Sequence, residues 1–206
     1  MRKRAPVTTA LLVVIALVYA LEWVMPATLI NYGAIDHDTI FAGQLWRLVT
    51  SMFLHSPPQE ALGWLHWLSN SWAIYQLGTL YEVLFGSKRF AFVYFASGIV
   101  AGLASSMYQH GPAVGASGAV FGILGAFIFS IRRSPQYRHE RWTKNLLGQL
   151  LFLIALNLYI GYKVEFIDNV AHVGGLVAGL LLGFLPHRVP PPPPGQSVID
   201  VQPYEG

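Results

Sequence analysis

The chain has 206 residues, of which 54% are hydrophobic and only 11% are charged, and its mean hydropathy is +0.47. Soluble domains carry about 25% charged residues, so this composition excludes an ordinary soluble domain and indicates a membrane protein. The net charge is +3 with the basic residues confined to short segments, so we expect no nucleic-acid partner, and the lack of cysteine excludes a cysteine nucleophile, a thiolate metal site and disulfides.

Six apolar stretches predict an all-α, polytopic membrane protein with six transmembrane helices. They cover residues 7–24, 61–81, 90–107, 116–131, 146–161 and 167–185. About 20 helical residues cross roughly 30 Å of hydrocarbon, and the first three stretches and the sixth are near that length. The fourth and fifth have about 16 residues, or roughly 24 Å, so these helices must be recessed or the bilayer must thin around them.

The first stretch follows Arg2, Lys3 and Arg4, so a cleaved signal peptide is an alternative interpretation. Its apolar run of 18 residues is longer than a typical signal-peptide core, and the small-residue cleavage pattern around residues 18–20 is weak. We therefore interpret this stretch as a retained first helix.

The basic residues predict the orientation in the membrane. If the N-terminus is inside, the inner segments hold eleven of the thirteen Lys and Arg residues, and the outer segments hold only Arg47 and Lys163. This positive-inside bias places both termini in the cytoplasm and supports an even number of spans. We expect a multi-pass protein of the cell (inner) membrane.

Two segments outside the spans differ in character. Residues 25–60 form a long outer loop rich in aromatic and turn residues, and such a loop is often functional. Residues 188–206 contain a proline run and polar residues, which predict a disordered cytoplasmic tail after a six-helix domain of residues 1–187.

Polar side chains inside membrane spans are costly and are therefore functional candidates. His66 and Asn70 lie four residues apart in the second span, Ser117 opens the fourth, and His172 lies about five residues into the sixth. In the predicted orientation all four residues reach one level in the outer half of the membrane.

Glycines predict that the fourth and sixth spans pack closely. Gly118 and Gly122 share a face of the fourth span, and Gly175, Gly179 and Gly183 share a face of the sixth. Ser117 and His172 would lie at the outer end of this contact. We expect them at the bottom of a water-filled cavity lined by the loop of residues 108–114.

A serine beside a histidine is the minimum for nucleophilic acyl transfer. His172 would take the proton of Ser117 and later give one to the leaving amine. The oxyanion would be stabilised by His66, Asn70 and the backbone N–H of Ser117 at a helix start. We interpret Asp168 as a solvated loop acid and therefore predict a dyad rather than a triad.

Each of these residues also has a plainer interpretation. A lone serine in a membrane helix usually bonds its own backbone, a lone buried histidine is usually structural, and glycine faces often serve only packing. His55, His66 and His172 could instead bind haem or a metal, although no second-shell acids accompany them. The combined pattern favours catalysis more strongly than any single residue does.

Taken together, these motifs resemble the rhomboid intramembrane serine proteases in their six-helix bacterial form. The resemblance covers roughly residues 5–187 and is highly specific because the motifs occur in order and on the expected spans. The motifs are His66-x-x-x-Asn70, Gly115-Ala116-Ser117-Gly118, Ala171-His172-x-Gly174-Gly175, and Trp46-Arg47 followed by Thr50-Ser51-Met52-Phe53-Leu54-His55.

The resemblance implies Ser117 as nucleophile, His172 as general base, and His66 and Asn70 as oxyanion donors. It also implies that Phe121 packs on the catalytic histidine. Among the supporting residues it implies that Trp46 and Arg47 shape the outer loop, that Gly115 and Gly118 flank the nucleophile, and that Glu82 makes a structural contact. The implied substrates are single-span membrane proteins that enter sideways from the lipid bilayer, and no cofactor is implied.

Two other functions remain open at this stage. An inactive rhomboid-like protein would bind membrane clients without cutting them, but such relatives typically lack the serine or the histidine. A small transporter or channel would use the polar cluster as a midplane binding site, but the cluster is shallow and no inverted repeat supports it.

Overall fold

The computed structural model describes residues 5–60, 62–108, 111–135, 138–164 and 167–185. These residues form helices and loops without a β-strand, which confirms the all-α prediction. In chain order the elements are α1 (Pro6–Glu22), α2 (Pro26–Gly33), α3 (His37–Phe41), α4 (Arg47–Thr50), α5 (Gly63–Ala73), the π-helical segment η1 (Ile74–Gly78), α6 (Thr79–Phe85), α7 (Ser87–Tyr108), α8 (Ser117–Arg133), α9 (Arg141–Lys163) and α10 (Asn169–Gly183). The predicted tail of residues 188–206 lies outside the described residues.

Two of the described helices, α7 with 22 residues and α9 with 23, are long and apolar enough to cross a membrane. Two shorter helices, α1 and α10, are also apolar. The prediction of a short fifth span is therefore wrong, because α9 continues through the basic turn that begins at Arg141, which an apolar stretch does not include. Conversely, α10 has only 15 residues and begins after its N-cap, Asp168.

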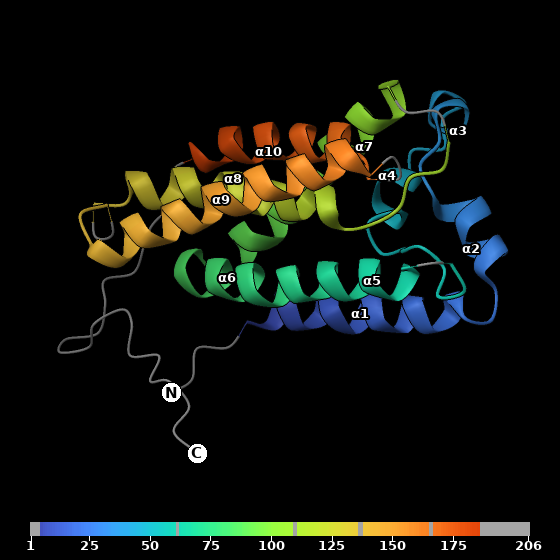
Figure 1. Cartoon of the computed structure of the whole chain (residues 1–206), viewed down its shortest axis with the longest axis horizontal. Coiled ribbons are helices and arrows are strands. Elements are labelled where there is room, and N and C mark those ends of the chain that lie inside the picture. Colours follow the sequence, from blue (N-terminus) through green and yellow to red (C-terminus); the bar gives the residue numbers. More distant parts are fainter. Residues whose placement is uncertain (1–4, 61, 109–110, 136–137, 165–166, 186–206) are drawn as a thin grey trace, which may run out of the picture.

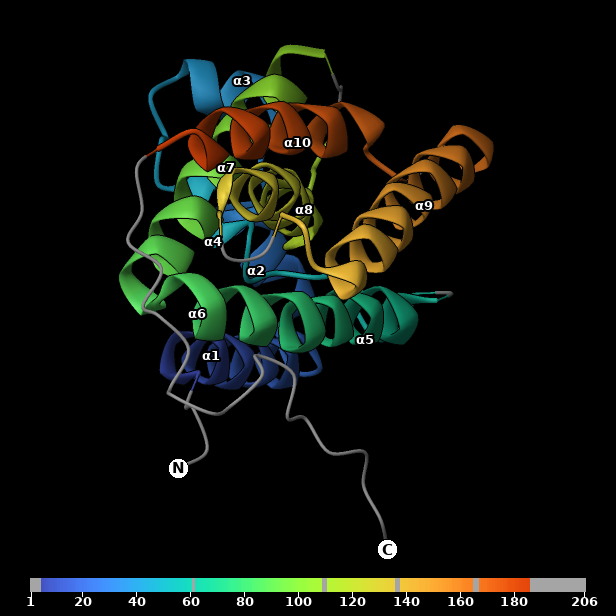
Figure 2. The same ribbon diagram turned by 90° about the vertical axis from the view of Figure 1, so that its left-hand side faces the viewer.

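Helix α8 occupies the centre of the molecule. Seen along its axis in Figure 2, it is surrounded by α7, α9, α10 and the α5–α6 layer, and α1 lies beyond that layer. Most of its residues from Gly118 to Ile131 are accordingly buried. A helix that is covered on most of its surface can be apolar on nearly all sides, as α8 is between Gly118 and Ile131.

The contact between α8 and α10 is made by glycine, as the sequence predicts. A Cβ on Gly175 would overlap the carbonyl oxygen of Gly118, and a Cβ on Gly179 would overlap that of Gly122. On α8, a Cβ on Gly125 would overlap the carbonyl oxygen of Leu176. The two backbones can approach this closely only because side chains are absent.

Helices α5 and α6 form one continuous layer through the π-helical segment η1, and α1 runs alongside it (Figure 1). Near the N-terminus of α1, the Glu82 carboxylate of α6 accepts the backbone N–H of Val7 at 3.0 Å and both the N–H and the hydroxyl of Thr8 at 2.8 Å. The carboxylate thereby satisfies donors at a helix start that have no partner within the helix.

The outer loop is ordered by three short helices, α2, α3 and α4, which gather at one end of the bundle (Figure 1). The Arg47 guanidinium is buried and donates to the carbonyl oxygens of Asn31 and Ala34, at 2.7 and 2.8 Å. Trp46 is exposed and donates from Nε1 to the carbonyl oxygen of Tyr32. Both side chains therefore hold the loop together.

Candidate active site

Ser117 is the first residue of α8 and is half-buried. Two residues before it, Gly115 has a φ of +122°, a backbone conformation that residues with a side chain rarely adopt. The N–H of Gly115 donates to the carbonyl oxygen of Ser51 at 2.9 Å, so the outer loop fixes the turn that leads into the helix. At a helix start the Ser117 backbone N–H has no partner within the helix, and the helix dipole favours an anion there.

His172 lies in the first turn of α10 and is buried, with 6% of its surface exposed. Its ring stacks on Phe121 with a centroid separation of 4.2 Å and an interplanar angle of 6°. Phe121 lies one turn after Ser117 on α8. If Gly118 carried a Cβ, that atom would lie 3.6 Å from the carbonyl oxygen of Ala171. The residues beside Ser117 and His172 thus meet at the same end of the α8–α10 contact.

His66 and Asn70, both on α5, border the turn before Ser117. The His66 Nε2 atom lies 2.8 Å from the point that a Cβ on Gly115 would occupy, and Asn70 Nδ2 lies 3.9 Å from it. The N–H of Ser56 points at His66 Nδ1 at 3.3 Å, so we assign Nδ1 as the acceptor and place the ring proton on Nε2. Asn70 donates from Nδ2 to the carbonyl oxygen of His66 at 2.9 Å.

Asp168 is not the solvated acid that the sequence suggested. It is half-buried, its Oδ1 accepts the N–H of Ala171 at 2.8 Å as the N-cap of α10, and its Oδ2 accepts the hydroxyl of Ser105 on α7. The cap could have been recognised from an acid three residues ahead of an apolar helical run. Ser105, a contact across two helices, carries no such signal.

A pocket opens beside Ser117 between the outer loop and the starts of α8 and α10. Its lining includes Ser51, Met52, Ala113, Val114 and Ala171. Ala113 and Val114 belong to the loop predicted to line a cavity, while residues 109 and 110 lie outside the described residues. Ser117 also lines this pocket, so water entering here would reach its hydroxyl.

The positions of the histidines can be compared with the alternative that they bind a metal ion. Among the described residues, no group of three His, Cys, Asp or Glu side chains is arranged to hold a metal ion. The rings of His55 and His66 lie 5.2 Å apart, whereas the ring of His172 stacks on Phe121. The described site therefore contains a hydroxyl, an imidazole and several N–H donors, a set that suits acyl transfer.

Comparison with known proteins identifies the family. A family model for the rhomboid domain matches residues 42–189. The chain is 35% identical over 152 residues to rhomboid protease GluP of Bacillus subtilis (strain 168), which covers 74% of this chain and 28% of that protein. It is 36% identical over 166 residues to RHOMBOID-like protein 6, mitochondrial, of Arabidopsis thaliana, which covers 77% of this chain and 50% of that protein.

A second Arabidopsis thaliana protein, RHOMBOID-like protein 1, is 36% identical over 160 residues, covering 77% of this chain and 39% of that protein. The match thus spans between about a quarter and a half of the length of these relatives. Because the family model covers well over half of the sequence, the chain belongs to the rhomboid family.

Proposed function

We propose that this protein is an intramembrane serine endopeptidase that cleaves the transmembrane segments of single-span membrane proteins through a Ser117–His172 dyad. The observation that carries this proposal is the stacking of His172 on Phe121, one turn after Ser117, at the glycine contact between α8 and α10. Membership of the rhomboid family and its relative named rhomboid protease GluP support the same reaction.

In the proposed mechanism the Ser117 hydroxyl attacks the scissile carbonyl carbon while His172 takes its proton. The oxyanion that forms receives hydrogen bonds from His66 Nε2–H, the Asn70 amide and the Ser117 backbone N–H. When the intermediate collapses, His172 gives its proton to the leaving amine, and an acyl-enzyme remains. A water molecule from the pocket, deprotonated by His172, then releases the second product and restores Ser117.

The proposed topology has six spans within residues 1–187, with both termini cytoplasmic and the protein in the cell (inner) membrane. The basic residues support this orientation, since eleven of thirteen lie in the segments that it makes cytoplasmic. The active site then opens toward the outer side. Substrates approach from the lipid and unwind so that the scissile carbonyl reaches Ser117, and the reaction uses no cofactor.

The decisive experiment is cleavage of a panel of tagged single-span proteins in proteoliposomes. Ser117→Ala and His172→Ala each remove a reacting group, so we expect cleavage to fall at least about a thousandfold while the protein stays folded and inserted. Ser69→Ala and His139→Ala change exposed residues of the same two types and should retain the wild-type rate.

Fluorophosphonate labelling adds an independent reading of the nucleophile. An enzyme should be labelled at Ser117, and a protein that only binds clients should not. Wild-type cleavage by either dyad variant would show that the roles are wrongly assigned.

A further inference from the structure

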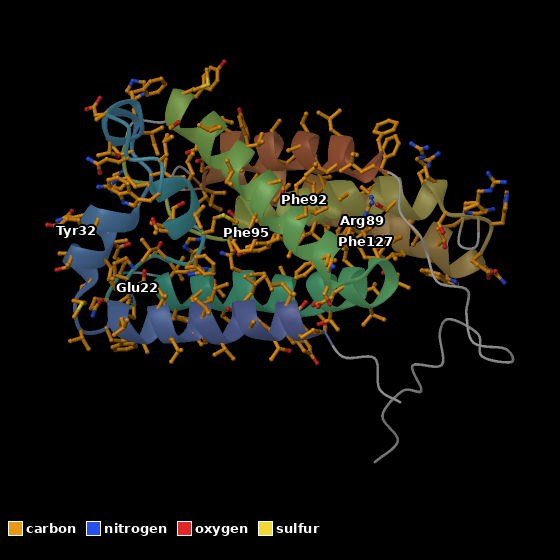
Figure 3. The ribbon with its side chains drawn as sticks, turned by 180° about the vertical axis from the view of Figure 1, so that it is seen from behind. Glu22, Tyr32, Arg89, Phe92, Phe95 and Phe127 are labelled. Atoms are coloured by element: carbon orange, nitrogen blue, oxygen red, sulfur yellow. The ribbon has the colours of Figure 1, made fainter. Side chains whose placement is uncertain are left out.

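The C-terminal end of α1 carries a fully buried carboxylate, Glu22. Its Oε1 accepts the backbone N–H of His55 at 2.8 Å, while Oε2 has no partner among the described residues. Figure 3 labels Glu22 at the end of α1 nearest the outer-loop helices. Burying a carboxylate is costly unless it is hydrogen-bonded. Glu22 lies before the matched rhomboid domain and takes no part in the proposed reaction.

The His55 side chain does not offer this carboxylate a positive charge. The ring is completely buried, with edge contacts to Tyr19 and His66. Burial first, and then the neighbouring His66, lower the pKa of His55 to about 3, so the ring is uncharged at neutral pH. Glu22 therefore holds the outer loop through the peptide N–H of His55.

Ser56, the residue after this anchored peptide N–H, approaches His66 within hydrogen-bond distance. The Ser56 N–H lies 3.3 Å from His66 Nδ1, and its hydroxyl lies 3.1 Å from the same atom. Pro57 and Pro58 follow, and their rings restrict the backbone beyond this point. A bond made at His55 thus limits the movement of the Ser56 N–H directly.

We propose that Glu22 is a positioning residue for His66, because it holds the peptide at His55 so that the Ser56 N–H keeps the imidazole proton on Nε2. That proton faces the turn at Gly115, where the oxyanion would form. The inference rests on the proposed function, which assigns His66 the role of oxyanion donor. It adds an anchor on α1, a helix outside the matched domain, to a site built by α5, α8 and α10.

Nitrogen-15 NMR of histidine-labelled full-length protein tests the positioning without requiring proteolysis. His66→Ala identifies the His66 signals. The wild type should show an unprotonated Nδ1 and a protonated Nε2, and Glu22→Ala should mix the two tautomers. Glu22→Gln keeps an oxygen acceptor of the same size and should keep the wild-type signals.

Cleavage kinetics test the consequence for the reaction. Glu22→Ala should lower kcat about tenfold, less than the 10²–10³ lost with a whole oxyanion donor, and leave KM within about twofold. Glu22→Gln should restore kcat. In a His66→Ala background, Glu22→Ala should cause no further loss, because its effect passes through that ring.

Glu82→Ala is the matched control, since Glu82 also joins α1 to the bundle through backbone N–H groups, but at the other end. It should lower the midpoint of thermal unfolding, and its kinetic effect should multiply with that of His66→Ala.

Unchanged His66 signals in Glu22→Ala would overturn the inference even if the protein cleaved no substrate. So would a Glu22→Ala loss that multiplies fully with His66→Ala.

Discussion

At the scale of single residues, Gly115 serves both the turn and the site. Its φ of +122° excludes most side chains, and a Cβ there would lie 2.8 Å from His66 Nε2. Gly115→Ala should therefore strain the turn by about 1–3 kcal/mol and displace His66, the proposed oxyanion donor. We expect cleavage to fall steeply, measured beside the thermal unfolding midpoint.

Gly111 provides the control for this prediction. It has the same φ of +122°, but among the described residues no atom beyond its chain neighbours lies within 4 Å of the position its Cβ would take. Gly111→Ala should carry the backbone cost without the contact and keep most of the activity. Equal losses of activity in the two variants would show that strain alone, rather than the contact with His66, matters at Gly115.

At the scale of helices, the α8–α10 contact holds the proposed nucleophile and base together. Gly179→Ala would press a methyl group into the carbonyl oxygen of Gly122, so we expect overpacking to cost about 1–3 kcal/mol and to separate the helices. Both the unfolding midpoint and the cleavage rate should fall. Gly148 lies on α9, and its added carbon would meet no described atom within 4 Å outside its own helix backbone, so Gly148→Ala should be neutral or slightly stabilising.

The same contact explains which parts of the structure were predictable from the sequence. Glycines repeated every four residues mark a helix face that packs closely, so the contact between α8 and α10 was predictable. A polar residue at the end of such a face stands out against an apolar span. The length of α9 was not, since its basic first turn hides the helix from hydropathy.

The contacts that cross between segments were also missed. Glu22 and His55 lie 33 residues apart and pair through a backbone N–H, which leaves no residue pattern to recognise. Ser105 and Asp168 lie 63 residues apart and pair through their side chains, again without a local residue pattern. Such bonds depend on the packed arrangement, and a single sequence does not encode them locally.

At the scale of the whole molecule, orientation decides the side of the membrane to which the proposed cleavage would release its products. The 23 residues of α9 extend about 34 Å, enough to cross roughly 30 Å of hydrocarbon, so its two ends should face opposite compartments. Because the chain has no cysteine, a single introduced thiol reports one position without background. Glu140 and Tyr162 are exposed near the two ends and leave every basic residue in place when changed.

An impermeant maleimide applied to intact spheroplasts should label Tyr162→Cys and spare Glu140→Cys, and both should react once the membrane is opened. The physical reason is the excess of Lys and Arg on the Glu140 side, which retains that side in the cytoplasm. Since Ser117 and His172 lie toward the same end of the bundle as the outer-loop helices, this labelling pattern would also assign cleavage to the outer half of the membrane. The reverse pattern would place the proposed site toward the cytoplasm and require substrates to be cut there.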